Sequence, residues 1–546
     1  MRVSEAVVEG LVDNGIDVVF GIPGKQTLPL NDAIEGREDV RFVVARHETA
    51  VSHQAWGYAE TTGRPAATVT VPGPGDMNAM NGLKNALNDC TPLVHVAVET
   101  DPHIRGGDGI HETPPDTYDN VLKENVLVES PTSTLAELER ALAIAETPPK
   151  GPVRVGVPKG FLRMDIPLAA AGTYDRHSVG EAPDDAIERA AGVLAGADSP
   201  VVIAGGGVRN ASATPQLREV AERLGAPVVT TYKGKGVVPD NHPLVAGTLS
   251  GSASPELLDL LAGADAALGV GTDFDAVATR GWSVEVPADL VHIALHPDDL
   301  GTGYDPTVGI VADAAAVLEG LATRLDAREV APSDGREQVR EVRERLAERL
   351  EPLRTESAPF TSVTVLERLR ETLPRETIVT ADAGGFRVWG LNVFAAYGPR
   401  SYVNPGSWAT MGTGLPSAIG AQVANPETPV VALTGDGGLL MCVHELHTAV
   451  TESVPLTVVV FSNDDYTIIS EEAERSYGFE PPAYGWSGDT VDFRTVAAGM
   501  GMAAEQVTTL AGMQATVREA VSSDEPTLVE VPTDPEEPQA SEWFAK

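Results

Sequence analysis

The stretch Leu433-Thr434-Gly435-Asp436-Gly437-Gly438 indicates what kind of fold this sequence forms. It ends the apolar run 429–433, which is typical of a buried strand, and it precedes the amphipathic segment 440–450, which predicts a helix. A glycine-rich turn between a parallel strand and a helix lets backbone N–H groups approach a diphosphate closely. The turn therefore predicts an α/β domain with a phosphate site at the carboxyl edge of its sheet.

A second polar turn follows the next strand-like run, 456–461, and contains Asn463, Asp464 and Asp465. Adjacent parallel strands end at the same edge of a sheet, so Asn463 can reach an ion held by Asp436. Oxygen ligands completed by diphosphate oxygens suit Mg²⁺. Either turn alone would be an ordinary strand-to-helix connection, but the pair predicts a magnesium site at the phosphate-binding edge.

Strand-like runs alternate with amphipathic segments in three successive blocks of the chain. This alternation is typical of βαβ units, which build a parallel sheet with helices on both faces. We therefore predict an α/β fold of three tandem doubly wound parallel-sheet domains, at residues 1–171, 183–328 and 358–534. The charge-dense amphipathic stretch 334–356 predicts a surface helix that connects the second domain to the third.

The composition limits the classes of function. The 546 residues include 79 acidic and 39 basic side chains, for a net charge of −40. Nucleic acids and anionic membranes select basic patches, so the charge argues against both as partners. No apolar run approaches the roughly 18 residues of a membrane span, and acidic residues interrupt the N-terminal segment where a secretory signal would be apolar. We expect a cytoplasmic protein, and the even spread of acidic residues favours a halophilic surface adapted to molar salt.

The two polar turns resemble the metal-binding motif of the thiamine-diphosphate-dependent enzymes, in the group of acetolactate synthase, pyruvate decarboxylase and benzoylformate decarboxylase. The resemblance covers nearly the whole chain, and its central block is most like acetolactate synthase. It implies a pyrimidine-binding domain, a central domain and a diphosphate-binding domain, in that order. It also implies Asp436, the Asn463 side chain and the Asp465 backbone carbonyl as Mg²⁺ ligands, with Gly437 and Gly438 against the cofactor.

The N-terminal block carries the second half of this resemblance. Arg46-His47-Glu48 resembles the segment with the activating glutamate, which implies that Glu48 hydrogen-bonds the cofactor's N1′ and promotes removal of the thiazolium proton. The early turn with Pro23 and Gly24 is similar to a cofactor-binding turn of the group. Met411 matches the bulky residue that bends the cofactor. Two subunits share each site in this group, which implies a homodimer or homotetramer with active sites at the subunit interface.

The resemblance leaves the fate of the bound carbanion open, because the characteristic acceptor and proton-donor residues are replaced. Glu472 stands where synthases have a tryptophan, and Ile469 replaces the catalytic glutamate of pyruvate decarboxylase. Lys25 and Val71 occupy the places of the serine and histidine of benzoylformate decarboxylase. His111 falls at the position of one histidine of the pyruvate decarboxylase pair, so it is our candidate catalytic residue beside Glu48.

We therefore predict an acetolactate synthase-like carboligase that decarboxylates a small-molecule 2-oxo acid and transfers the carbanion to an acceptor carbonyl. Two alternatives stay open: a non-oxidative decarboxylase that releases an aldehyde, and a catalytically silent cofactor-binding paralogue. Intact Glu48, Asp436 and Asn463 argue against silence, because a silent chain need not retain them. FAD, which many synthases bind, has little support here, because Asp273 and residues 276–277 depart from the flavin-contacting pattern.

Overall fold

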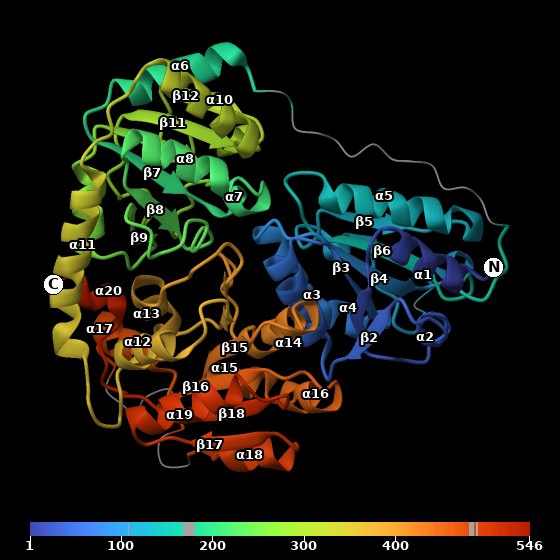
Figure 1. Ribbon diagram of the computed structural model, residues 1–546. Coiled ribbons are helices and arrows are strands. Elements are labelled where there is room, and N and C mark those ends of the chain that lie inside the picture. The colour runs from blue at the N-terminus through green and yellow to red at the C-terminus, as the bar shows by residue number, and fades with distance from the viewer. Residues whose placement is uncertain (108, 168–179, 181, 480–484, 487–489, 546) are drawn as a thin grey trace.

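The computed structural model describes residues 1–107, 109–167, 180, 182–479, 485–486 and 490–545, and it contains three six-stranded parallel sheets (Figure 1). Helices lie between most successive strands of each sheet, so the predicted α/β fold of three tandem doubly wound domains is confirmed. The domain limits 1–171, 183–328 and 358–534 stay predictions, and position 171 lies outside the described residues. In the part of the chain that the structure describes, no helix is both long and apolar enough to cross a bilayer.

The N-terminal sheet has the strand order β2-β1-β3-β4-β6-β5. Because β2, β1 and β3 are neighbours, the turns that follow them meet at one carboxyl edge, where the sequence places Gly24 and Glu48. The strands are β1 (Val18–Gly21), β2 (Arg41–Val44), β3 (Ala66–Thr70), β4 (Leu93–Glu99), β5 (Glu124–Leu127) and β6 (Val153–Pro158). The helices are α1 (Val3–Asp13), α2 (Leu28–Glu35), α3 (Glu48–Thr62), α4 (Pro74–Asn88) and α5 (Thr134–Glu146).

The middle sheet has the order β12-β11-β10-β7-β8-β9, and its strands are short apolar runs whose side chains join two separate core clusters. The strands are β7 (Pro200–Ala204), β8 (Val228–Thr231), β9 (Val245–Leu249), β10 (Ala266–Val270), β11 (Asp289–Ala294) and β12 (Val308–Val311). The helices are α6 (Asp184–Ala195), α7 (Gly206–Asn210), α8 (Thr214–Leu224), α9 (Pro255–Ala262) and α10 (Ala314–Ala327). The predicted connecting helix is α11 (Gly335–Leu350), which runs from the middle domain to the C-terminal domain in Figure 1.

The C-terminal sheet has the order β14-β13-β15-β16-β18-β17, and Gly435 at the end of β15 pairs with Phe461 on β16. This register places the two polar turns side by side. The strands are β13 (Ile378–Ala381), β14 (Tyr402–Val403), β15 (Val430–Gly435), β16 (Thr457–Ser462), β17 (Ala503–Gln506) and β18 (Thr527–Pro532). The helices are α12 (Ser362–Thr372), α13 (Gly385–Val393), α14 (Gly414–Ala424), α15 (Asp436–Cys442), α16 (Glu445–Thr451), α17 (Thr467–Tyr477), α18 (Phe493–Gly499), α19 (Leu510–Ala520) and α20 (Ala540–Trp543).

The single helix predicted over 440–450 is wrong in detail, because the structure has two helices there. The first, α15, begins directly at Asp436, and the second, α16, begins at Glu445. Val443 and His444 lie between them and keep right-handed helical dihedral angles, so the backbone stays close to helical geometry across the break. Apolar periodicity does not detect a break of this kind, because the buried face continues through it.

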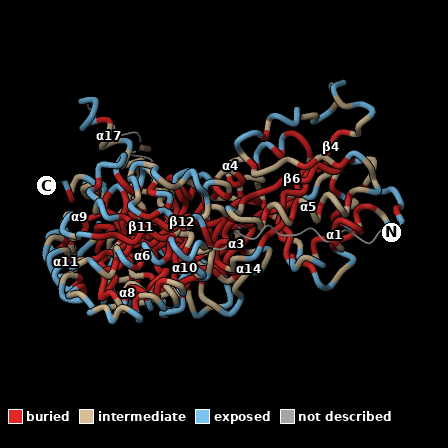
Figure 2. The backbone as a smooth tube through the Cα atoms, turned by 90° about the horizontal axis from the view of Figure 1, so that it is seen from above, coloured by how far each residue is buried: buried red, intermediate tan, exposed pale blue. Residues whose placement is uncertain are grey.

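Two glycines let the N-terminal and C-terminal domains meet backbone to backbone. A Cβ atom on Gly57 of α3 would lie 2.2 Å from the carbonyl oxygen of Ser417 on α14. A Cβ atom on Gly420 of α14 would lie 1.8 Å from the carbonyl oxygen of Gln54 on α3. Only glycine fits at such contacts. Figure 2 shows buried segments running through the middle of the molecule around α3.

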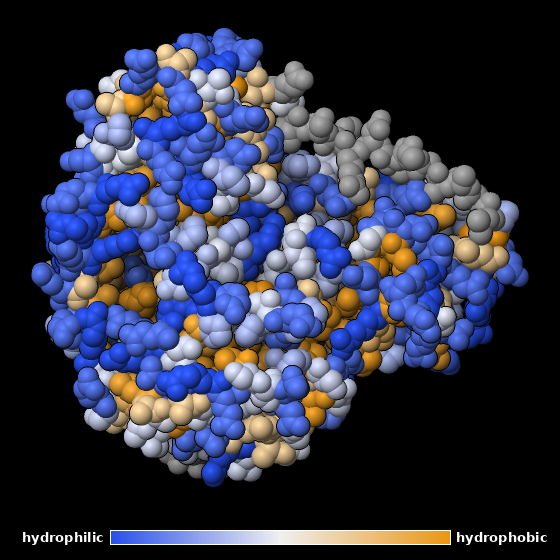
Figure 3. Space-filling model, in the orientation of Figure 1, coloured by the Kyte–Doolittle hydropathy of each residue, from blue (hydrophilic) through white to orange (hydrophobic). Residues whose placement is uncertain are grey.

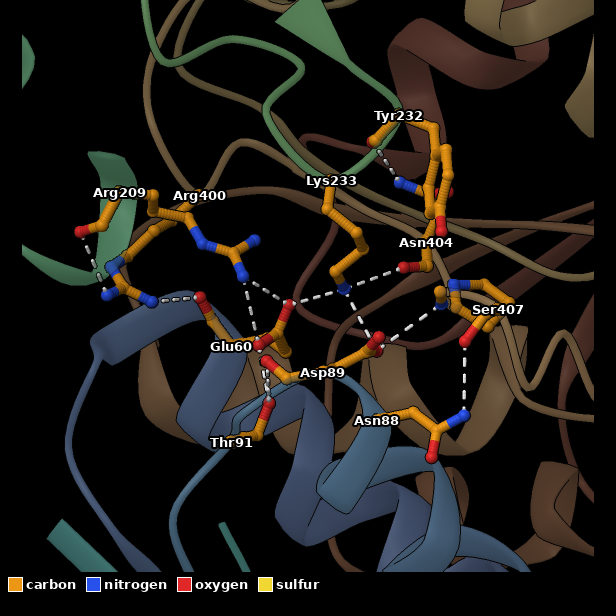
Figure 4. Close-up of polar contacts among 12 residues, drawn as sticks. Glu60, Asn88, Asp89, Thr91, Arg209, Tyr232, Lys233, Arg400, Asn404 and Ser407 are labelled. Atoms are coloured by element: carbon orange, nitrogen blue, oxygen red, sulfur yellow. Dashed lines mark hydrogen bonds and ion pairs between the residues drawn. The ribbon is translucent and has the colours of Figure 1, made fainter. Parts of the chain in front are cut away.

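A buried ionic cluster joins all three domains (Figure 4). The Nζ atom of Lys233, after β8, lies 3.0 Å from a Glu60 oxygen of α3 and 2.9 Å from an Asp89 oxygen after α4. It also donates a hydrogen bond of 3.0 Å to the carbonyl of Asn404 after β14, and Arg209 of α7 forms a second ion pair with Glu60.

The outer surface differs from this buried cluster, because hydrophilic residues cover most of the face seen in Figure 3.

Candidate functional site

A cavity of about 280 Å³ lies at the carboxyl edge of the C-terminal sheet. Its walls include the glycine-rich turn after β15, the polar turn after β16, the segment 383–385 after β13, and the loop before α14. Four segments that are far apart in the sequence therefore meet at one place. The predicted site residues that line this cavity are Met411, Asp436, Gly437, Gly438, Asn463 and Asp465.

Asp436 fixes the geometry of both polar turns. Its Oδ1 atom accepts the N–H of Gly437 at 2.7 Å, and its Oδ2 atom accepts those of Asn463 at 2.9 Å and Asp464 at 2.6 Å. The side chain is almost completely buried, and this burial raises the pKa of Asp436. A bound divalent cation would favour the ionised carboxylate, which offsets the cost of burying its charge.

Asn463 and Asp465 complete an oxygen-rich donor set. The Asn463 amide nitrogen donates to the Thr467 hydroxyl at 2.7 Å, which identifies its other atom as the oxygen, and this oxygen accepts the Asp465 N–H at 3.3 Å. Among the described residues, no three His, Cys, Asp or Glu side chains gather closely enough to hold a metal. A cation here would depend on one carboxylate, one amide oxygen, a backbone carbonyl and ligand oxygens. That donor set fits Mg²⁺.

The glycine-rich turn is shaped for a close approach to its main chain. A Cβ atom on Gly437 would lie 2.5 Å from the Tyr466 ring and 3.4 Å from the Met411 methyl group. A Cβ atom on Gly438 would lie 2.7 Å from an oxygen of Asp382. Side chains are therefore excluded at both positions, and the main chain at the start of α15 faces the cavity. This cradle fits a diphosphate.

Asp382 does not line the cavity itself but holds two segments that do, and our sequence reasoning missed it. Its buried carboxylate accepts the N–H groups of Gly412 and Thr413 at 3.2 Å and the Thr434 hydroxyl at 3.1 Å. It therefore ties the loop that carries Met411 to the strand that leads into the glycine-rich turn. The available signal was its position just beyond the strand-like run 377–380, after Ala381, which resembles the position of Asp436 at the end of its own strand.

The predicted residues of the N-terminal domain gather at the carboxyl edge of that domain's sheet. Glu48 is the first residue of α3, and one of its carboxylate oxygens accepts a hydrogen bond of 3.1 Å from the Asn78 amide. A Cβ atom on Gly75 would lie 2.9 Å from the other carboxylate oxygen. A Cβ atom on Gly24 would lie 2.1 Å from the side chain of Val71, which follows β3.

His111 lies at this same edge. Its Nδ1 atom is 3.5 Å from the amide nitrogen of Gln26, in the turn that begins with Pro23 and Gly24. A Cβ atom on Gly73 would lie 2.8 Å from the His111 carbonyl oxygen, so the His111 loop passes over the segment that follows β3. The His111 backbone adopts a left-handed conformation with φ of 64°, and the side chain is exposed.

The two groups of predicted residues do not line a common cavity in the single chain. All residues that line the cavity at Asp436 belong to positions 362–539. Glu48, His111, Pro23 and Gly24 are not among them. The predicted site residues thus form two separate groups, which we call half-sites: Pro23, Gly24, Glu48 and His111 at the carboxyl edge of the N-terminal sheet, and the cavity residues at that of the C-terminal sheet.

Comparison with known protein families gives one consistent result over the three sheets. The model described as "Thiamine pyrophosphate enzyme, N-terminal TPP binding domain" matches residues 1–120. The central domain of the same family matches residues 187–321, and its C-terminal TPP binding domain matches residues 382–531. The last range begins directly after β13 and contains β15 and β16, and the carboxyl ends of these three strands surround the cavity.

Similar curated proteins cover nearly the whole chain. A probable acetolactate synthase large subunit of Methanococcus aeolicus is 29% identical over 98% of this chain and 92% of its own. The acetolactate synthase isozyme 1 large subunit of Escherichia coli (strain K12) is 29% identical over 98% of this chain and 94% of its own. The probable 2-ketoarginine decarboxylase AruI of Pseudomonas aeruginosa is 31% identical over 97% of this chain and 94% of its own.

Proposed function

The chain belongs to the family of thiamine pyrophosphate enzymes, and we propose that it is a thiamine-diphosphate- and Mg²⁺-dependent carboligase. In this proposal, the enzyme removes CO₂ from a small-molecule 2-oxo acid and joins the remaining acyl carbon to an acceptor carbonyl. The observation that carries the proposal is the cavity at the glycine-rich turn, where Asp436, Asn463 and Asp465 offer oxygen ligands beside an accessible main chain.

Residues of the C-terminal domain hold the cofactor in this proposal. Bound thiamine diphosphate supplies a nucleophilic ring carbon that adds to the substrate carbonyl and stabilises the negative charge left when CO₂ departs. Asp436, the Asn463 amide oxygen and the Asp465 carbonyl hold Mg²⁺ against the diphosphate. Gly437 and Met411 both line the cavity, where the main chain of Gly437 would contact the phosphate oxygens and the Met411 side chain would support the cofactor.

Glu48 hydrogen-bonds the pyrimidine ring in this proposal and holds a proton there, so that the neighbouring amino group can act as a base. Its carboxylate lies at the edge of the N-terminal sheet, outside the cavity at Asp436 of the same chain. This separation supports a homodimer or homotetramer. In such an assembly the N-terminal domain of one subunit completes the cavity of its partner.

The cavity wall favours ligation over release of an aldehyde. Ile468 and Ile469 of α17 both line it, and when the assembled site covers the exposed Ile469, these apolar side chains would keep water away from the reacting carbon. Slow proton delivery leaves more time for an acceptor carbonyl to react. The relatives named as acetolactate synthases or probable acetolactate synthases support the same outcome.

The relative named as a probable 2-ketoarginine decarboxylase favours a second candidate function. This candidate is a non-oxidative decarboxylase that protonates the acyl carbon and releases an aldehyde. His111 would then be the proton donor, since it lies at the same edge of the N-terminal domain as Gly24. Both candidates use the same half-sites and differ only in the electrophile that reaches the reacting carbon.

Product analysis distinguishes the candidates. The purified enzyme with thiamine diphosphate and Mg²⁺ is given a panel of 2-oxo acids with alkyl, aryl and cationic side chains, and CO₂, aldehyde and ligation product are quantified. We expect the amount of ligation product to exceed that of aldehyde. The control His103→Ala removes an exposed histidine from a neighbouring turn and should leave the ratio of ligation product to aldehyde unchanged. If the wild type releases almost only aldehyde and His111→Ala does not, the enzyme is a decarboxylase. Absence of CO₂ with every substrate would contradict both candidates.

A further inference from the structure

Glu445, the first residue of α16, is completely buried and lies outside the cavity at Asp436. One of its carboxylate oxygens accepts the backbone N–H groups of Arg46 at 2.9 Å and His47 at 3.1 Å, the two residues that precede Glu48. We propose that Glu445 is a positioning residue that fixes the main chain beneath Glu48. This inference rests on the proposed function of Glu48 as the group that acts on the cofactor.

The second carboxylate oxygen of Glu445 extends the support to the body of α3. It accepts a hydrogen bond of 3.1 Å from the Gln54 amide and one of 2.7 Å from the Thr448 hydroxyl. Four donors from two domains therefore converge on one buried carboxylate. Because its two oxygens bind the turn before α3 and a residue six positions into α3, they fix both the position and the rotation of this helix start.

The Arg46 side chain provides a second connection at the same place. Its guanidinium group donates hydrogen bonds of 2.9 Å to the His447 ring and 2.8 Å to the Thr451 hydroxyl, both on α16. The turn before Glu48 is therefore held by α16 through its main chain and through a side chain. On the other side, the Glu48 carboxylate accepts a hydrogen bond from Asn78. The direction of this carboxylate consequently depends on where α16 holds the start of α3.

Two consecutive helices of the C-terminal domain connect the two half-sites. Asp436 begins α15 and Glu445 begins the next helix, so one short helical segment carries a wall of the C-terminal half-site and the support of the N-terminal half-site. A displacement of about 1 Å at a reacting group can reduce a rate by about 100-fold. Loss of Glu445 leaves the N–H groups of Arg46 and His47 without their acceptor, which frees the turn to move.

The test measures cofactor activation separately from cofactor binding and stability. Full-length variants are saturated with thiamine diphosphate and Mg²⁺, and the exchange of the thiazolium C2 proton for deuterium is followed by NMR after acid quenching. In Glu445→Ala we expect exchange to slow by about tenfold or more, while the cofactor dissociation constant changes less than about threefold. Glu445→Gln should exchange within about threefold of the wild type, because its amide oxygen can still accept from Arg46 and His47.

Two further variants separate positioning from a general structural role. Thr448→Val removes one buried hydrogen bond to the same carboxylate but leaves Arg46 and His47 bonded, so exchange should stay within about threefold of the wild type. Glu445→Asp keeps the charge on a shorter side chain, and it should slow exchange even if Glu445→Ala fails to fold. A C2 exchange rate equal to that of the wild type in Glu445→Asp or Glu445→Ala would overturn the proposal. An exchange rate in Thr448→Val as low as that in Glu445→Ala would overturn it as well. Wild-type exchange in Glu48→Gln would instead overturn the proposed function of Glu48.

Discussion

The buried carboxylate of Asp436 accepts the backbone N–H of Asn463 at 2.9 Å, so one predicted metal ligand holds the main chain of the other. The parallel pairing of β15 with β16 brings these two turns together, and the hydrogen bond then fixes their separation. Asp436 thus lines the cavity and also anchors the neighbouring turn. In the proposed metal site, removing Asp436 would take away one ligand and would free the main chain of the second, Asn463.

We therefore expect Asp436→Ala to weaken the binding of thiamine diphosphate and Mg²⁺ together, by at least about 100-fold, because in the proposed site one ion would hold the diphosphate to the protein. Calorimetric titration of the cofactor at several Mg²⁺ concentrations measures both affinities. Asp524→Ala removes the same charge from an exposed turn and should leave them unchanged. Cofactor affinity that does not depend on Mg²⁺ in the wild type would contradict the metal assignment.

Glu48→Gln should keep the fold, because a half-buried carboxylate is replaced by an amide of equal size. The exchange of the cofactor C2 proton should slow by at least about 100-fold, because an amide cannot hold the proton at the pyrimidine nitrogen in the same way. Cofactor affinity should change less, since the diphosphate and Mg²⁺ ligands stay in place. NMR of quenched samples gives the exchange rate, and a rate equal to that of the wild type removes Glu48 from the mechanism.

His53 makes the stability depend on pH. It is fully buried in α3, and burial lowers its pKa from 6.5 to about 4. Between these values the unfolded chain binds a proton that the folded chain does not, so this histidine makes the protein less stable as the pH falls from about 6.5 to about 4. Relative to His53→Gln, which cannot titrate there, the wild type should lose about 2 kcal/mol between pH 7 and pH 5. Urea unfolding at both pH values measures this difference, and parallel pH profiles of the two proteins would contradict it.

The acidic surface predicts stability that depends on salt. At a net charge of −40, acidic side chains repel one another over a Debye length of about 10 Å in 0.1 M salt, and over less than about 3 Å in several molar salt. The melting temperature should therefore be clearly higher in about 3 M KCl than in about 0.1 M KCl. NaCl of equal ionic strength should act alike, because screening depends on ionic strength. Equal melting temperatures would indicate an acidic but not halophilic surface.

The cluster around Lys233 should contribute strongly to the stability of the three-domain arrangement. Burial by itself raises the pKa of Glu60, but the charges of Arg209 and Lys233 outweigh this effect and lower the pKa to about 2. Lys233→Met leaves the negative charges of Glu60 and Asp89 buried with one cation fewer beside them. The free energy of unfolding should therefore decrease by about 3–5 kcal/mol. Chemical denaturation measures the loss, with Lys159→Met at an exposed position as the control. Equal stability of the two variants would contradict this account.

The sequence was sufficient to predict those parts of the fold and of the site that depend on local residue patterns. Apolar runs and glycine-rich turns predicted the three parallel sheets, and the neighbouring strands β15 and β16 allowed us to expect Asp436 and Asn463 together. Glu445 and Lys233 could not be found in this way, because their partners belong to other domains and lie up to several hundred residues away. Such contacts depend on how whole domains pack, and no local periodicity encodes that packing.

The glycine contacts between α3 and α14 have a consequence for recombination between related chains. A new side chain at Gly57 or Gly420 would collide with main chain, and rigid main chain cannot rotate away as a side chain can. A hybrid that takes its first domain from one parent and its last from another succeeds only if both parents keep these two positions open. Crossovers are therefore best placed on both sides of the middle domain, with α3 and α14 inherited from the same parent.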